Sequence, residues 1–476
     1  MKQTSQSFLA SADAAMAQPQ LRETMQALGT GLPALRSAAM EQLGNFEELR
    51  QHLKAVKQHT LTHLEHYLVR YEEQVHQRGG HVHWARGAEE LNSIVLDICR
   101  QRDARHVVKG KSMVTEETDL TAQLQAAGLE VTETDLGEYI IQLAGEYPSH
   151  IVGPALHKSQ AEIRELFLQE HSLGERELED VEALVQEARE VLRQRFLNAD
   201  VGITGANALI AEDGRSMLVT NEGNGDLAST LPKVQIVCAT IDKLLPRPED
   251  ATAMLRLLSR SAVGTVTSAY ASFYTGPRHD DDLDGPDEYH VILLDNQRTD
   301  MLDTNYEEML GCMRCGACLN HCPIYMAAGG HAYGWVYPGP MGSVLTPLLT
   351  GLEQANSLPN ACTACGRCAE VCPAAIPLPD LLRDLRAEEH QRGLSPLSWR
   401  SGLKLHSLLA RSPGLYRQVT AIGIGLLRLL ARGRGQLQSI VFDNGWTEVR
   451  DLPRPQGKTF MQQYRSASKN KATDDD

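Results

Sequence analysis

Eight cysteines in two short runs are the residues of this sequence whose types and spacing could do chemistry. The first run has cysteines at positions 312, 315, 318 and 322, followed by Pro323. The second has them at 362, 365, 368 and 372, followed by Pro373. Cys-x2-Cys-x2-Cys-x3-Cys-Pro is the spacing with which bacterial proteins bind iron–sulfur clusters. Because the spacing occurs twice, the sequence predicts two [4Fe–4S] clusters.

The two runs are expected to share their clusters. In two-cluster proteins the first three cysteines of a run bind one cluster, and the fourth binds the other. Cluster one would then be held by Cys312, Cys315, Cys318 and Cys372. Cluster two would be held by Cys362, Cys365, Cys368 and Cys322. The small residues between them let the backbone wrap closely, with N–H groups free to point at sulfur: Gly316, Ala317, Ala364 and Gly366.

A pair of zinc sites and a disulfide framework are the alternatives to clusters. Zinc usually takes two Cys-x2-Cys pairs rather than a run of four cysteines that ends in Cys-Pro. Disulfide frameworks are typical of short secreted chains, and this chain has 476 residues. The two remaining cysteines, Cys99 and Cys238, stand among apolar residues, and we expect both to be buried, unreactive thiols.

Composition and charge limit the function classes. The net charge is −15, which disfavours general nucleic-acid binding. The length suggests about three domains. The first twenty residues do not resemble a secretory signal, and no stretch approaches the roughly eighteen apolar residues of a membrane span. Oxygen-sensitive clusters without an export signal predict a cytoplasmic protein.

Four regions are expected to position these residues. Residues 1–90 are expected to form a helical N-terminal region, with a break in the periodicity at Gly79-Gly80. Residues 91–300 alternate short β-type runs with helical runs, which indicates an α/β domain. Expected strands include 106–109, 131–134, 150–152, 233–239 and 290–295, with a hairpin of 202–211 and 217–220 on Asp213-Gly214. Residues 301–390 carry the cysteines, after an expected helix at 306–314, and residues 391–476 form a basic helical region and tail.

Two loops of the α/β region could bind an anion. Lys109-Gly110-Lys111-Ser112 is an expected strand-to-helix turn with two lysines, although it lacks the Walker spacing. The glycine-rich loop 221–226 follows an expected strand, and its Glu222 could in principle act as a nucleophile. Connectors that only turn the chain are the more ordinary interpretation of both loops.

Four histidines share a face of the expected N-terminal helix: His52, His59, His63 and His66. The His59-His63 pair has the i, i+4 spacing of metal ligands. No cysteine or carboxylate nearby completes a site, so the polar flank of an amphipathic helix is the favoured interpretation.

Residues 391–442 contain eight basic residues and no Asp or Glu, interleaved with leucines. A basic, apolar helix of this kind can lie on an anionic membrane surface or on a partner protein. Packing against the acidic remainder of this chain is the interpretation we favour, and a peripheral docking surface is its main rival.

The cysteine runs, together with residues 109–117, 135–144 and 330–340, closely resemble the lactate-utilisation iron–sulfur protein family. The resemblance covers nearly the whole chain, and segments 109–117 and 330–340 make it specific. It implies a lactate-utilisation α/β domain, similar in fold to sugar-phosphate isomerases and CoA transferases. It also implies an α-helical ferredoxin domain with two cubane clusters, like that of succinate dehydrogenase iron–sulfur subunits.

The resemblance further implies one subunit of a cytoplasmic complex that oxidises L-lactate to pyruvate. Its partners would be a cysteine-rich iron–sulfur protein and a second protein with a lactate-utilisation domain. No catalytic residue can be assigned by position, and the electron acceptor is unknown. Two alternatives stay open: the α/β domain could bind and oxidise lactate itself, with Lys109 or Lys111 on the carboxylate, or the protein could be a redox-sensing regulator.

Overall fold

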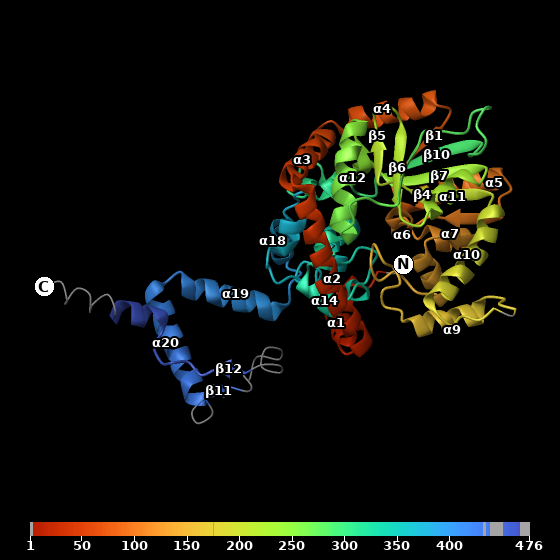
Figure 1. The fold of residues 1–476 in the computed structure, drawn as a ribbon. Coiled ribbons are helices and arrows are strands. Elements are labelled where there is room, and N and C mark those ends of the chain that lie inside the picture. The colour runs from red at the N-terminus through yellow and green to blue at the C-terminus, as the bar shows by residue number, and fades with distance from the viewer. Residues whose placement is uncertain (1–2, 175, 432–434, 438–450, 467–476) are drawn as a thin grey trace. The chain divides into compact units, whose positions relative to one another are not determined.

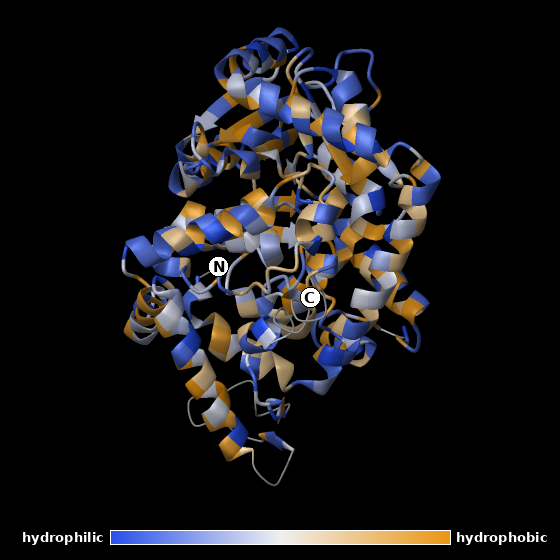
Figure 2. Cartoon of the chain, turned by 90° about the vertical axis from the view of Figure 1, so that its left-hand side faces the viewer, coloured by the Kyte–Doolittle hydropathy of each residue, from blue (hydrophilic) through white to orange (hydrophobic). Residues whose placement is uncertain are grey.

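The computed structural model describes residues 3–174, 176–431, 435–437 and 451–466. The chain forms two compact units, Met1–Arg392 and Gly393–Asp476. The first unit contains the α/β region and both cysteine runs. Hydropathy colouring of its helices shows orange and blue faces along the same helix, as expected for amphipathic helices that bury one side (Figure 2).

A six-stranded sheet forms the centre of the α/β region, in the order β1-β10-β7-β4-β2-β3 (Figure 1). All five strand pairs are parallel. Its strands are β1 (His81–Ala85), β2 (His106–Lys109), β3 (Glu130–Glu133), β4 (Val201–Gly205), β7 (Val234–Thr240) and β10 (Glu288–Leu294). Every residue of β7 is buried, because a central parallel strand is covered on both faces.

Helices cover both faces of this sheet. Ile236 and Cys238 of β7 point into a core with Leu91 and Val95, and the alternate residue Val237 joins the core on the other face. Helices α4 (Leu64–Gln77), α5 (Ala88–Gln101), α6 (Met113–Glu117) and α7 (Leu120–Ala126) belong to these layers. Helices α8 (Leu136–Ala144), α9 (Gln160–Glu170) and α10 (Val181–Leu197) lie between β3 and β4 along the chain, and α11 (Asn224–Thr230) directly precedes β7.

A smaller sheet lies beside the first, in the order β8-β5-β6-β9. Its strands are β5 (Ala208–Ile210), β6 (Arg215–Thr220), β8 (Leu244–Leu245) and β9 (Tyr270–Tyr274). The buried side of helix α12 (Pro248–Val263) packs on it through Met254 and Leu257. The short 3-10 helix η2 (Ile241–Lys243) joins β7 to β8.

The cysteine region is built of short helices wrapped by the N-terminal ones. Its helices are η4 (Glu307–Gly311), α13 (Ala317–Asn320), α14 (Pro323–Ala328), α15 (Gly339–Thr350), α16 (Leu352–Ala355), α17 (Arg367–Val371) and α18 (Leu378–Gln391). Helix α1 (Phe8–Met16) packs on α14, α2 (Pro19–Leu43) on α12 and α14, and α3 (Phe46–Thr62) on α12 and η4 (Figure 1). The N-terminal helices therefore join the α/β region to the cysteine region.

Several expected elements differ in the structure. Residues 81–85, placed in the expected helical N-terminal region, form β1, because they pair with the distant strand β10, and local periodicity cannot reveal such a pairing. The expected hairpin is only β5–β6, since residues 201–205 belong to the large sheet. Residues 150–152 form a loop, and the expected helix at 306–314 is the shorter 3-10 helix η4. Strand β9 had no counterpart in the sequence analysis.

The second unit contains helices α19 (Leu397–Ala410) and α20 (Pro413–Leu430) and a ribbon of β11 (Gln436–Leu437) and β12 (Leu452–Pro453). Neither helix buries a side chain, and leucines such as Leu408 are exposed. Among the described residues, no helix is long and apolar enough to cross a bilayer. That these helices pack on the acidic regions stays a prediction, as does the four-part division of the chain.

Candidate iron–sulfur site and adjoining cavity

Both cysteine runs begin with the same backbone turn. The second residue after the first cysteine, Arg314 or Ala364, has a positive φ of 60° or 55°. Its N–H donates to that cysteine's sulfur, at N–Sγ distances of 3.4 and 3.3 Å. Gly316 and Gly366 follow at φ 77° and 80° and begin the short helices α13 and α17. The glycines could be foreseen; the left-handed Arg314 and Ala364 could not, because such residues rarely adopt that conformation.

The eight thiols lie in two groups of four. The first group lines one small cavity: Cys312, Cys315, Cys318 and Cys372. In the second group, Cys368 interacts electrostatically with Cys322, Cys362 and Cys365, and Cys322 interacts with Cys362 and Cys365. Each group unites three cysteines of one run with the fourth of the other. The crossed arrangement expected from the spacing requires this grouping.

The surroundings of the sulfurs fit a cubane cluster. Burial raises the pKa of Cys315 to about 12 and that of Cys372 to about 11, so binding iron must displace protons. The Ile376 N–H lies 3.5 Å from the Cys372 sulfur, in addition to the two N–H donors above. Four thiols around a small buried cavity, with N–H donors aimed at sulfur, suit an iron–sulfur cluster. Cys365 alone among the eight is exposed.

Arginines of the N-terminal helices hold the second run in place. Arg50 of α3 donates to the carbonyls of Cys372 and Ala369, at 2.8 Å each. Arg36 of α2 donates to the Val371 carbonyl, also at 2.8 Å. These bonds fix the backbone around Cys372, the residue that crosses to the first group. No sequence signal marked either arginine, because the contact joins positions more than 300 apart along the chain.

A cavity of about 280 Å³ opens at the carboxyl ends of β2, β4 and β7. This edge is where open α/β sheets commonly bind ligands. Both candidate anion loops line it, through Gly110, Lys111 and Ser112 and through residues 221, 222, 224 and 225. The opposite wall is the start of the first cysteine run, residues 313–315. The cavity therefore lies directly against the first group of thiols.

Close packing shapes the floor of this cavity. A Cβ on Gly205 would lie 2.8 Å from the Ser112 hydroxyl oxygen, so only glycine at the end of β4 lets that side chain approach. At the mouth, the Leu136 N–H donates to Glu222 at 3.1 Å. Desolvation by the surrounding protein raises the pKa of Glu222, and the negative charge of Asp135 raises it further. A nucleophilic role for Glu222 stays a prediction.

Comparison with known proteins places the chain in a family. Residues 68–294 match the LUD domain and residues 308–376 match the 4Fe-4S dicluster domain. A relative called Lactate utilization protein B, from Geobacillus sp. (strain WCH70), is 43% identical over 91% of both chains. Another of that name, from Bacillus velezensis, is 42% identical over 92% of both. The chain belongs to the lactate utilization protein B family.

Among solved structures, a DUF162 family protein from Deinococcus radiodurans aligns with 48% of this chain and 98% of its own. The sequence identity is 14% and the TM-score 0.28.

The LUD match of the present chain begins within α4, before the predicted domain boundary at residue 91. The dicluster match contains both cysteine runs, so an iron–sulfur domain is established here.

The two segments that made the family resemblance specific meet in a buried network. Glu117 accepts a 2.5 Å hydrogen bond from the Tyr337 hydroxyl and a bidentate pair from Arg298, at 2.9 and 2.8 Å. The Arg298 Nε bonds to Asp242 at 3.1 Å. Burial opposes ionisation of Asp242, but Arg314 and Arg298 hold its pKa well below the usual range. The Arg314 guanidinium stacks 5.4 Å from the Tyr337 ring, so this network orients the first cysteine run.

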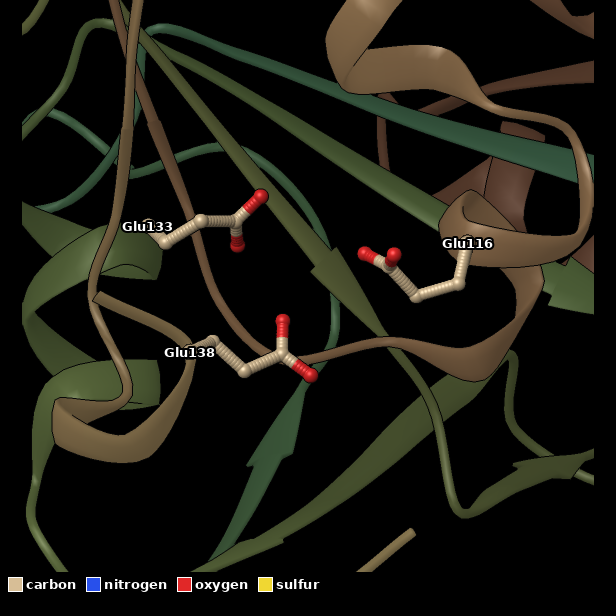
Figure 3. A group of neighbouring side chains, drawn as sticks. All are labelled: Glu116, Glu133 and Glu138. Atoms are coloured by element: carbon tan, nitrogen blue, oxygen red, sulfur yellow. The ribbon is translucent and has the colours of Figure 1, made fainter. Parts of the chain in front are cut away.

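Lys109 does not face the cavity. Its ammonium is fully buried, 3.0 Å from Glu116 and Glu133 and 3.9 Å from Glu138. The three carboxylates point toward one another (Figure 3), as metal ligands would, but the Lys109 ammonium already serves them as cation. The prediction that Lys109 could meet a lactate carboxylate is therefore wrong, while Lys111 does line the cavity.

The remaining candidates have ordinary structural roles. Cys99 and Cys238 are buried in the core of the large sheet, as predicted, and burial raises the pKa of each to about 12. His59 bonds to the Tyr67 hydroxyl at 3.0 Å. His52 lies 3.4 Å from Asp250. The ring of His63 packs edge-to-face against His59, and that of His66 against Tyr67, as on the flank of a helix.

Proposed function

We propose that this protein is the iron–sulfur electron-transfer subunit of a system that oxidises L-lactate to pyruvate. One observation supports this most: two groups of four thiols, each drawn from both runs, in a chain 43% identical to proteins called Lactate utilization protein B. A soft, largely buried four-thiol site suits an electron carrier. The eight ligands we propose are those predicted from the spacing.

Two [4Fe–4S] clusters, each a one-electron carrier, would accept in turn the two electrons that oxidation of lactate to pyruvate releases. The chain's own residues hold the thiols, exclude water and aim N–H donors at sulfur. Arg36, Arg50 and Arg314 place positive charge beside the first group, which offsets the negative charge of thiolate ligands. Their position favours electron uptake at that group.

The partners we propose are a cysteine-rich iron–sulfur protein and a second protein with a lactate-utilisation domain, together with an acceptor of electrons. The cytoplasmic location stays a prediction. So does docking of the basic α19–α20 segment on a membrane surface or partner.

Anaerobic reconstitution tests the proposal. Two cubane clusters require about eight iron atoms per chain and an EPR signal on reduction. With the two partner proteins present, L-lactate should produce that signal, and D-lactate or buffer should not. Clusters that form normally but never respond to lactate would refute the lactate assignment, and zinc in place of iron would refute electron transfer altogether.

Paired cysteine variants test the crossed ligation. Crossed ligands place Cys312 and Cys372 on one cluster, so replacing both by alanine should leave one cluster and about half of the iron. Replacing Cys312 and Cys322 should damage both clusters. Ligation within each run predicts the reverse for these two pairs. Cys99→Ala, a buried cysteine outside the runs, is the control and should retain full iron content.

A further inference from the structure

Polar atoms without partners surround the cavity beside the first cysteine run. Lys243, at the end of η2, is only 7% exposed, and no hydrogen bond or ion pair of its ammonium is found among the described residues. The hydroxyls of Thr204 and Thr240 are also buried there without a hydrogen-bond partner, and both residues are 1% exposed. The Thr220 hydroxyl is a third. Buried polar groups are normally satisfied, so these atoms offer hydrogen bonds to a ligand in the cavity.

The charges around the cavity show what kind of ligand it would be. Lys111 donates to the Val152 carbonyl at 2.7 Å and interacts with the carboxylate of Glu222. Arg314 is engaged by the Cys312 carbonyl, at 3.2 Å, and by Asp242, at 3.9 Å. Lys243 remains the cation that no direct contact neutralises. One unneutralised cation beside neutral hydroxyls suits a ligand with a single negative charge.

The carboxylates of the cavity lie apart from Lys243. Asp135 and Glu222 interact with each other on the side formed by α8 and the loop 221–226. Lys243 instead interacts with Arg314, Lys57 and Cys312, and with Asp242, whose carboxylate Arg298 and Arg314 already engage. An anion is therefore attracted to the end of the cavity nearest the first group of thiols and repelled from the other end.

We propose that this cavity binds a small monocarboxylate, with its carboxylate on Lys243 and its other oxygen atoms on the free threonine hydroxyls. A 2-hydroxy or 2-oxo acid has the single charge and the additional oxygen that this lining can satisfy. The volume admits a small organic acid with water beside it. Because Cys315 forms part of the wall, such an occupant lies next to the proposed ligands of cluster one. Only the choice of lactate and pyruvate as probes rests on the proposed function.

Ligand binding to the full-length, cluster-loaded protein under nitrogen tests the site. We expect L-lactate and pyruvate to raise the melting temperature and to give a calorimetric binding signal. Lactamide, the neutral analogue of lactate, should do neither. Lys243→Gln should weaken binding of both acids by on the order of tenfold or more, since an interaction with a charged partner is lost. Lys233→Gln, at an exposed lysine outside the cavity, should bind them as the unmodified protein does.

The melting temperature of the Lys243→Gln variant without ligand provides a second measurement. Removing an unpartnered buried charge should leave the melting temperature unchanged or raise it, whereas loss of a structural lysine would lower it. Thr240→Val should also weaken binding, because a ligand oxygen loses its hydroxyl donor. Equal affinity of Lys243→Gln and unmodified protein, equal binding of lactamide, or no binding of either acid would each overturn the proposal.

A role of Lys243 in balancing cluster charge makes a different prediction. In that case Lys243→Gln would lower the reduction potential of a cluster and leave carboxylate affinity unchanged, which also overturns the binding site. The proposed function fails by a separate result, clusters that lactate never reduces in the complete system. Carboxylate binding that depends on Lys243 would survive that failure.

Discussion

Lys109 and Lys243 are buried lysines at the same edge of one sheet, and their neighbours give them opposite properties. Burial disfavours the charge of Lys109, but Glu133, Glu116 and Glu138 outweigh it and raise the pKa of Lys109. For Lys243 burial prevails, with Arg314 adding repulsion, and its pKa falls to about 8. Lys109 is thus a structural cation, whereas Lys243 is left to meet a ligand. Lys109 ends one β-type run and Lys243 follows another, so the sequence does not distinguish their roles.

Lys109→Met should destabilise the α/β region by about 3–5 kcal/mol, because it leaves three buried carboxylates without their cation. Glu133 and Glu138 already have raised pKa values, first through burial, and losing Lys109 raises them further. A carboxyl with a raised folded-state pKa favours the folded state at low pH and loses that contribution as pH rises. The unfolding free energy lost in Lys109→Met should therefore be smaller at pH 5 than at pH 8, as measured by urea denaturation. Adding Glu138→Gln should restore part of the loss, and a deficit independent of pH would contradict this account.

His150 links the loop after α8 to the cysteine region. Its Nδ1 accepts from the N–H groups of Val152 and Gly153, at 3.0 and 3.1 Å, and its Nε2 donates to Asn320 of α13 at 3.1 Å. The two hydrogen bonds that Nδ1 accepts require the neutral ring. Burial lowers the pKa of His150 to about 4. The segment was expected to be a strand, and its role depends on this one side chain instead.

The neutral His150 predicts a loss of stability in acid. A histidine with a depressed folded-state pKa stabilises the fold above its unfolded pKa of about 6.5 and loses that contribution as pH falls toward 4. Between pH 7 and pH 4.5, the unmodified protein should lose about 2–3 kcal/mol more unfolding free energy than His150→Gln, which cannot be protonated. Urea denaturation at both pH values measures the difference, and parallel losses would exclude His150 as the cause.

At the scale of elements, α2 and α3 act as a brace for the second cysteine run. The sequence predicts an amphipathic helix over α3 from the spacing of Leu49, Leu53 and Val56, and these residues do pack into the core with α12. Arg50 lies outside that stripe, and its importance comes from the carbonyls of Cys372 and Ala369. Helix and cysteine run support each other only in the folded chain.

Arg50→Gln should loosen Cys372 and speed the release of iron from one cluster. Losing two hydrogen bonds from a charged group weakens the support by about 2 kcal/mol, so release to a chelator should accelerate by on the order of tenfold. Anaerobic chelation followed by absorbance measures the rate. Arg70→Gln, at an exposed arginine of α4, is the matched control. Equal rates in Arg50→Gln and the control would show that the brace does not matter.

At the scale of the whole molecule, Met1–Arg392 behave as one compact unit although they contain two matched domains. Helices α2 and α3 contact both the α/β region and the cysteine region, and α1 packs on the cysteine region. The network of Glu117, Arg298 and Tyr337 crosses the same boundary. The cavity of about 280 Å³ exists because the two regions are held together, since both contribute lining residues.

Removing the iron should loosen one part of this unit and spare the other. The thiols lie between α13–α18 and the N-terminal helices, while β7 and β10 have a complete apolar core of their own. After anaerobic chelation, hydrogen exchange should increase in residues 308–376 and in α2 and α3 and stay slow in β7 and β10. Exchange that rises equally everywhere would mean that the clusters stabilise the entire unit.

The strongest sequence predictions were those in which neighbouring positions carry the information. Cysteine spacing identified the thiols that gather, and short apolar runs located β2, β3, β7 and β10. Strand β1 was missed because its partner β10 lies about two hundred positions away. Lys109 was misjudged because its three carboxylates approach it from α6, β3 and α8.

The sequence by itself predicted which thiols gather, because the cysteines of each run stand within a few residues and their spacing is fixed by the chain. Only the tertiary structure decided what surrounds those atoms: the Arg50 brace, the buried network and the cavity with Lys243. Burial and contacts between residues distant in the sequence decide whether these side chains are charged and whether they have partners. Neither burial nor such contacts can be deduced from local sequence.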